Sequence, residues 1–195
     1  MGKSKINVAI VIDGGDTLQG ERKSGLLQEI VAETGLALAD RDTDGIAPVV
    51  LAGSRVIPAG DINLRELETD ILLDGISGVT RLAPAIEAAS LALPAGEPGA
   101  IAVVSDFQVA DEDEVCDLVL RLGQQGNRFL LNVRVSDAEG GADFAQKLDD
   151  LGEGENDVCD TVHATDDTGA RLEDVRGVVG RELDEWAAKV TKISA

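Results

Sequence analysis

Five runs of mostly apolar residues recur along the chain of 195 residues, and each has the length of one buried strand. Val, Ile, Leu and Ala dominate these runs, and Gly, Asp or Pro residues follow most of them. The pattern predicts strands at Ile6–Ile12, Ile46–Ala52, Ala100–Ser105, Phe129–Val135 and Val158–Ala164. A further short strand is expected at residues 54–58, after the second run.

Segments with apolar residues at helical spacing lie between the strands. Helices are therefore expected at Gly25–Ala39, at Leu64–Leu73, from about Ala83, and at Asp111–Leu122, Ala142–Leu151 and Leu172–Val190. The acidic residues at the start of the Asp111 helix complement the helix dipole, and we interpret them as a solvated helix start.

The alternation of strands and helices favours one fold class. Near-continuous apolar strands are typical of a parallel sheet that is covered on both faces. We predict a doubly wound α/β fold with a mostly parallel sheet and helices on both faces, a three-layer Rossmann-like sandwich. No repeat or internal linker divides the chain, so residues 1–195 are expected to form a single domain.

Charge and composition exclude several classes of function. The formal net charge of −20 repels phosphate backbones, and only 2% of the residues are aromatic, so nucleic-acid binding is not expected. No apolar run is long enough to cross a membrane, and we expect no signal peptide before the first strand. Cys116 and Cys159 lack metal-ligand spacing. We therefore expect a cytoplasmic protein with reduced cysteines and no membrane partner.

Candidate chemistry gathers where the strands end. Ligands of open α/β sheets bind beyond the carboxyl ends of the strands. Asp13 ends the first strand, Asp106 follows the strand at Ala100–Ser105, Thr17 lies four residues after Asp13, and Thr80 precedes a helix. Carboxylate and hydroxyl oxygens are hard ligands that suit Mg²⁺ or Mn²⁺. A structural interpretation stays open, because the same residues also form turns and helix caps.

These residues resemble the metal-ion-dependent adhesion site of the von Willebrand factor A (vWA) family. In that family the first strand is followed by Asp-x-Ser-x-Ser, a later loop supplies a Thr, and an Asp, usually in Thr-Asp-Gly, ends a later strand. Here the first motif reads Asp13-Gly14-Gly15-Asp16-Thr17, while Thr80 and Asp106 match the later positions. Gly15 departs from the pattern because it has no hydroxyl, and Asp16 is a further candidate for a nearby carboxylate.

A narrower resemblance, to the vWA proteins of the tellurium-resistance (Ter) system, covers nearly the whole chain. It rests on the ordered set "SGLLQEIVAETGLALADRDTDG", "DFAQKLDDL", "CDTVHATDD" and "ELDEWAAKV". The resemblance implies a non-catalytic interaction module in a stress-response or tellurium-resistance setting, alongside Ter-family proteins. It also implies Mg²⁺ or Mn²⁺ contacts from Asp13, Thr17, Thr80 and Asp106, and a protein partner that offers an acidic side chain at the metal.

Two alternatives remain open. Gly15 could mark a decayed site, which would leave a metal-free vWA scaffold that binds partners through shape and charge. A haloacid-dehalogenase-like phosphatase would also use Asp13 and Thr17, followed by Ser105 and the pair Asp166–Asp167. The general acid of such an enzyme would fall at Gly15, and glycine has no proton to donate. No dinucleotide-binding glycine motif follows the first strand.

Overall fold

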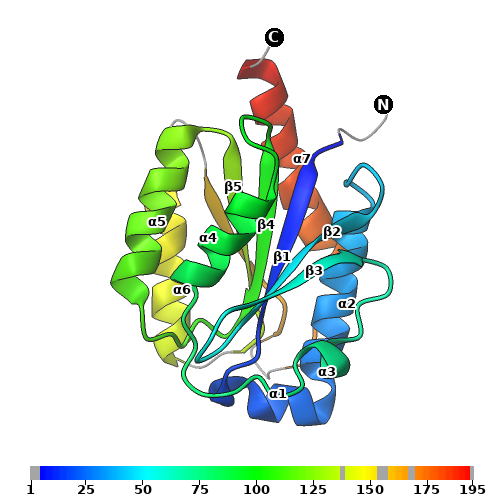
Figure 1. Ribbon diagram of the computed structural model, residues 1–195, viewed down its shortest axis with the longest axis vertical. Coiled ribbons are helices and arrows are strands. Elements are labelled where there is room, and N and C mark those ends of the chain that lie inside the picture. Colours follow the sequence, from blue (N-terminus) through cyan, green and yellow to red (C-terminus); the bar gives the residue numbers. More distant parts are fainter. Residues whose placement is uncertain (1–4, 137–138, 153–157, 167–169, 194–195) are drawn as a thin grey trace.

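A six-stranded sheet forms the centre of the computed structural model, which describes residues 5–136, 139–152, 158–166 and 170–193 (Figure 1). The strand order is β3-β2-β1-β4-β5-β6, and every neighbouring pair is parallel except β2 and β3. The strands are β1 (Asn7–Asp13), β2 (Ile46–Ala52), β3 (Ile57–Asn63), β4 (Gly99–Ser105), β5 (Arg128–Arg134) and β6 (Cys159–His163).

Helices cover both faces of this sheet, as Figure 1 shows. One apolar core lies between the sheet and helices α2 and α7, and a second lies between the sheet and helices α4, α5 and α6. The helices are η1 (Asp16–Leu18, a 3-10 turn), α1 (Gln19–Ser24), α2 (Leu26–Ala39), α3 (Thr69–Leu72), α4 (Ala83–Ala92), α5 (Glu112–Gln125), α6 (Glu139–Gly152) and α7 (Val175–Ile193). The predicted three-layer α/β fold is confirmed.

The apolar character of β1 follows from its central place in the sheet. Ile10 and Ile12 belong to the core under α2 and α7, whereas Ala9 and Val11 belong to the opposite core. Successive side chains of a strand point to opposite faces, so a strand buried on both faces needs an unbroken apolar run. The same reasoning applies to β4, in which every residue is buried.

Two predicted elements differ from the structure. The helix expected at Leu64–Leu73 is wrong, since only Thr69–Leu72 is helical. Asn63 holds a turn there, because its side chain accepts the N–H of Arg65 and its backbone carbonyl accepts that of Glu66. The short strand expected at residues 54–58 is instead β3, the antiparallel edge strand Ile57–Asn63. The turn η1 and helix α1 precede α2, whereas the first helix was predicted to begin at Gly25.

Apolar side chains are buried on both faces of the sheet. Trp186 of α7 is 2% exposed and stacks on Phe129 of β5 with ring centroids 5.2 Å apart. Cys116 and Cys159 are buried and free.

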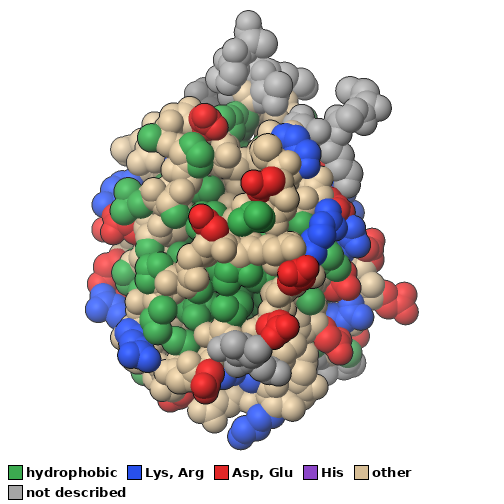
Figure 2. Space-filling view, turned by 45° about the vertical axis from the view of Figure 1, so that its right-hand side comes forward, with side chains coloured by type: hydrophobic (Ala, Val, Ile, Leu, Met, Phe, Trp, Pro, Cys, Tyr) green, Lys and Arg blue, Asp and Glu red, His purple; other side chains and the backbone are tan. Residues whose placement is uncertain are grey.

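No helix within the described ranges is long and apolar enough to cross a membrane. Figure 2 shows one face of the molecule, on which acidic and basic side chains are interspersed around a central area of hydrophobic ones.

The register of the central strands places the candidate chemistry. Ile12 of β1 pairs with Val104 of β4, so Asp13 lies beside Ser105 at the carboxyl edge of the sheet. On its other side Asp13 pairs with Ala52, the last residue of β2. Asp13, at the end of β1, therefore lies between the ends of β2 and β4.

Candidate functional site

Asp13 is the centre of a buried cluster of oxygen atoms at the carboxyl edge. Its Oδ1 accepts hydrogen bonds from the Thr80 hydroxyl at 2.6 Å and the Gly15 N–H at 2.8 Å. Its Oδ2 accepts a hydrogen bond from the Ser105 hydroxyl at 2.6 Å. Asp13, Thr80 and Ser105 are each at most 1% exposed. Residues from two loops and from the end of β4 are thus tied to one carboxylate.

The environment of Asp13 disfavours its negative charge. Burial raises the pKa of the Asp13 carboxyl to about 6, although the hydrogen bonds from Ser105, Thr80 and Gly15 lower it. The nearby Asp106 raises the pKa of Asp13 further. No ion pair joins Asp13 or Asp106 to any cationic side chain in the described part of the chain. A cation bound between these two buried carboxylates would offset the cost of burying their negative charges.

Gly15 is closely packed against Thr80. A Cβ atom at position 15 would lie 2.1 Å from Thr80 Oγ1 and 3.1 Å from Asp13 Oδ1. The backbone of Gly15, with φ −62° and ψ 168°, is one that any residue adopts. Space, not conformation, therefore restricts this position to glycine. Thr80 fills the place where the vWA motif has its first serine.

Asp106 follows β4 and is 1% exposed. Its carboxylate accepts the Gln108 N–H at 3.0 Å and the Gln108 side-chain amide at 3.2 Å. The loop amide contact matches the structural interpretation of this residue. The start of α6 presses on the backbone here, because a Cβ at Gly141 would lie 1.8 Å from the Asp106 carbonyl oxygen.

Phe107 marks strain beside this carboxylate. It has φ 61° and is the only described residue other than glycine with a positive φ. Such a backbone costs about 1–2 kcal/mol for a residue with a side chain. Two contacts compensate: Phe107 is 1% exposed in the apolar core, and its N–H donates to the Ser105 hydroxyl at 2.9 Å. Strain of this kind gathers at functional sites.

Thr17 and Asp16 lie at the surface, outside the buried cluster. Thr17 is exposed within η1 and forms no hydrogen bond with the cluster. Asp16 is exposed as well, and its Oδ1 accepts the N–H of Gly78 at 2.9 Å while its own N–H donates to the Gly78 carbonyl at 3.0 Å. Asp16 thus fixes the loop that carries Thr80.

Two further residues hold the loops in place. Asp111 is 1% exposed, and its two carboxylate oxygens accept the N–H groups of Leu82 and Ala83 at 3.0 Å each. It therefore caps α4 from the neighbouring loop. The interpretation of Asp111 as part of a solvated helix start is wrong. The Arg22 guanidinium donates to three backbone carbonyls, those of Gly14, Leu73 and Ile76.

The donor set fits a small hard cation in its chemistry. It brings together two carboxylates, from Asp13 and Asp106, and the hydroxyls of Thr80 and Ser105. Among the described residues no group of three or more His, Cys, Asp and Glu side chains could hold a metal, so hydroxyl oxygens would have to complete the set. Gly15 adds no side-chain oxygen atom, and Thr17 is exposed.

The structure joins Asp13 and Thr80 by a hydrogen bond, and the charge of Asp106 lies near enough to raise the pKa of Asp13. Their role as metal ligands stays a prediction. Ser105 and Asp111 are the residues whose roles at this edge sequence reasoning missed. The signal for Ser105 was the strand end that it shares with Asp106. Of the residues that a phosphatase would need, Asp166 is exposed and Asp167 lies outside the described residues.

Comparison with solved structures identifies the fold. The vWA domain of SpRpn10 superimposes with a TM-score of 0.65 at 12% identity, covering 91% of this chain and 95% of that one. BatB from Bacteroides thetaiotaomicron gives 0.60 at 13% identity, covering 94% and 99%. The manganese-loaded TRAP protein of Plasmodium vivax gives 0.55 at 10% identity, covering 84% and 70%.

The chain therefore has a vWA-like fold, and the expected resemblance is confirmed at that level. Comparison of the sequence with protein-family models gave no match, and neither did comparison with curated proteins. Identities of 10–13% establish the fold and not the function.

Proposed function

We propose that the chain is a non-catalytic vWA-type interaction module that binds a protein partner at the carboxyl edge of its sheet with the help of Mg²⁺ or Mn²⁺. One observation carries the proposal: the buried carboxylate of Asp13, whose pKa is about 6, lies near Asp106 and pairs with no described cation. Asp13, Thr80 and Asp106 would hold the ion, and Thr17 would contact it through water.

The partner's chemistry follows from this arrangement. A divalent ion at the edge of the sheet accepts a further oxygen ligand, so the partner would present an Asp or Glu side chain. The manganese-loaded TRAP structure, which has a similar fold, supports the choice of metal. The resemblance to Ter proteins supports a cytoplasmic stress-response or tellurium-resistance role with Ter-family partners.

Catalysis does not form part of this proposal. The place of a phosphatase's general acid is taken by Gly15, which has no side-chain proton to donate. Lys147, the one lysine available to a phosphatase between Ser105 and Asp166, lies exposed on α6.

A metal-free scaffold is the second candidate. It is favoured by the closed hydrogen bonding of Asp13, which has three donors, and by the packing of Thr80 against Gly15. In this form the loops would keep one shape without an ion, and partners would recognise the surface around them.

Isothermal titration with Mg²⁺ and Mn²⁺ tests the proposal. The wild-type chain should show one saturable site that Asp106→Asn weakens by at least about tenfold, since a ligating carboxylate is lost. Asp61→Asn, which changes an exposed acid of β3, is the matched control and should bind as wild type. Equal binding by Asp106→Asn and Asp61→Asn would support the metal-free scaffold.

A further inference from the structure

Val79 is an exposed aliphatic side chain next to the candidate site. It is 65% exposed, and its neighbour Thr80 is buried against Asp13. The loop is fixed on both sides of Val79, because Gly78 bonds to Asp16 and Thr80 forms a bridge with Val109. The ordered backbone therefore holds this apolar side chain in solvent beside the candidate site, where a partner bound at the carboxyl edge would meet it.

The turn between β2 and β3 lies directly against this loop. The Ser54 N–H donates to the Ser77 carbonyl at 3.0 Å, and the Arg81 N–H donates to the Gly53 carbonyl at 3.2 Å. Gly78 is so close that a Cβ there would lie 2.8 Å from Ser54 Cβ. These contacts put the turn that carries Arg55 against the loop that carries Val79.

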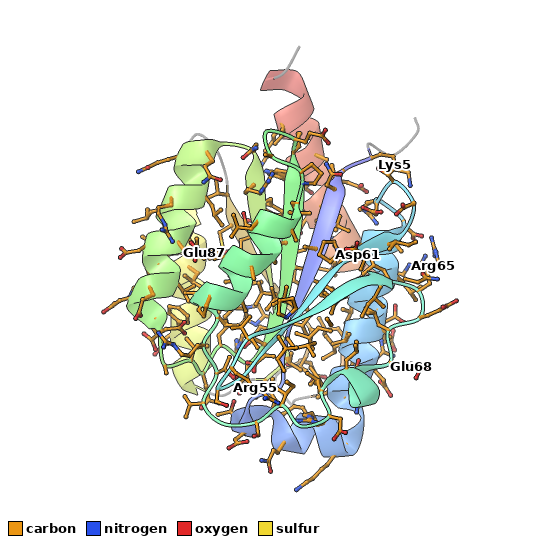
Figure 3. The ribbon with its side chains drawn as sticks, viewed as in Figure 1. Lys5, Arg55, Asp61, Arg65, Glu68 and Glu87 are labelled. Atoms are coloured by element: carbon orange, nitrogen blue, oxygen red, sulfur yellow. The ribbon has the colours of Figure 1, made fainter. Side chains whose placement is uncertain are left out.

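Arg55 is a free cation on a chain of net charge −20. It is exposed and forms no ion pair or hydrogen bond with the described residues. Arg81, on the other side of Val79 in the sequence, is 55% exposed and lies 3.7 Å from Glu114 and 4.0 Å from Asp111. Figure 3 shows Arg55 at the end of the molecule that carries α1, whereas Arg65 lies beside α2.

We propose that Val79 and Arg55 form a metal-independent contact for the partner, whose docking segment carries an apolar side chain next to a carboxylate. The apolar side chain covers Val79, and the carboxylate pairs with Arg55. Charge complementarity selects an acidic segment here although the protein as a whole is acidic, since repulsion by distant surface charges is screened beyond about 8 Å at physiological salt. Asp16 also contacts Gly78. Its negative charge repels a carboxylate of the partner there unless a bound cation lies between the two.

This inference rests on the proposed function only in using the carboxyl edge as the partner-binding surface. Metal-assisted binding and binding through the Val79–Arg55 contact can be tested separately. Binding is therefore measured first with a chelator present and then with Mg²⁺ added.

The test uses the full ¹⁵N-labelled chain and a capped peptide, Gly-Ser-Leu-Glu-Ser-Gly, with a second peptide in which Gln replaces Glu. In chelator, the Glu peptide should shift the amide signals of Val79 and Arg55 and bind roughly threefold more tightly than the Gln peptide, as expected for an exposed ion pair. Arg55→Gln should remove this preference, whereas Arg65→Gln, the matched exposed arginine, should keep it. Val79→Ser should weaken both peptides by about fivefold or more.

Leu91→Ser is the control for Val79→Ser, since Leu91 is 81% exposed at the far end of α4. Equal binding of the two peptides, no binding of either, or shifts centred elsewhere would overturn the inference. Binding that requires Mg²⁺ and ignores Arg55 and Val79 would also overturn it, while leaving the proposed function intact. If the peptide binds in chelator and added Mg²⁺ does not change its affinity, the result supports the inference and contradicts the proposed role of the metal in partner binding.

Discussion

The Thr80 hydroxyl lies 2.6 Å from Asp13 Oδ1 and fills the space that a side chain at position 15 would need. Two loops that are 67 residues apart in sequence therefore share one small volume. A serine at position 15 would supply the hydroxyl of the vWA motif, but its Cβ would lie 2.1 Å from Thr80 Oγ1. A serine at this position would therefore collide with Thr80 before it could act as a metal ligand.

Gly15→Ser should destabilise the protein by about 2 kcal/mol, because the core around Thr80 must shift to admit the new atoms. Urea unfolding measures the change. Gly20→Ser is the matched control, since no atom lies within 4 Å of a Cβ at Gly20. Adding Thr80→Ala to Gly15→Ser should cost less than the sum of the single changes. Additive losses would show that the two side chains do not compete for space.

The contribution of Asp13 to the stability of the fold should fall as pH rises from about 4 to about 6. The folded-state pKa of Asp13, about 6, lies above its ordinary value of 3.8, so the native state binds this proton more tightly than the unfolded state does. The loss amounts to at most about 3 kcal/mol and is complete above that window. Unfolding free energies of wild type and Asp13→Asn measured across the window should diverge, because the variant has no such proton to lose.

Asp111→Ala should lower stability by about 2 kcal/mol and loosen the loop that carries Thr80. The change leaves the N–H groups of Leu82 and Ala83 without their acceptor at the start of α4. Amide hydrogen exchange should speed up at these two residues. Asp113→Ala, in the exposed first turn of α5, is the control and should change stability by less than about 0.5 kcal/mol.

Asp160→Asn should stabilise the protein at neutral pH. Burial, and then repulsion by Glu182, Asp149 and Glu185, raises the pKa of Asp160 to about 6, so its charge is unfavourable above that pH. Since Asp160 is half exposed, the gain should be about 0.5–1 kcal/mol, and it should shrink in high salt and vanish below about pH 4. A thermal melt at each pH measures it. A variant no more stable than wild type at pH 7 would mean that solvent fully screens these acids.

The apolar runs predicted the fold because β1 and β4 are buried on both faces and need unbroken hydrophobic sequence. The edge strand β3 mixes apolar residues with Asp61 and Asn63 and contains Pro58 and Gly60. Its length and its antiparallel direction could therefore not be predicted from an apolar run. The helix expected at Leu64–Leu73 failed because the local hydrogen bonds of Asn63 outweigh an apolar spacing that resembles a helix.

The candidate site was predictable where it depended on strand ends and unpredictable where it depended on register. Asp13 and Asp106 follow apolar runs, and the carboxyl ends of parallel strands meet at one edge. The bond from Ser105 to Asp13 requires the pairing of Ile12 with Val104, which no spacing along the chain reveals. Asp111 reaches α4 across 28 residues, a contact that only the folded loops create.

The most direct test of the proposed metal site is to locate bound Mn²⁺ on the protein. An acidic chain attracts Mn²⁺ along its whole surface, so the position of the bound ion matters more than its affinity. Small additions of Mn²⁺ to the ¹⁵N-labelled protein broaden amide signals near the ion. If the ion binds at the candidate site, broadening is confined at first to the loops at residues 14–17, 78–81 and 106–108. This broadening is lost in Asp106→Asn. Broadening centred on other acidic surfaces, such as the one around Asp160, would contradict the proposed metal site.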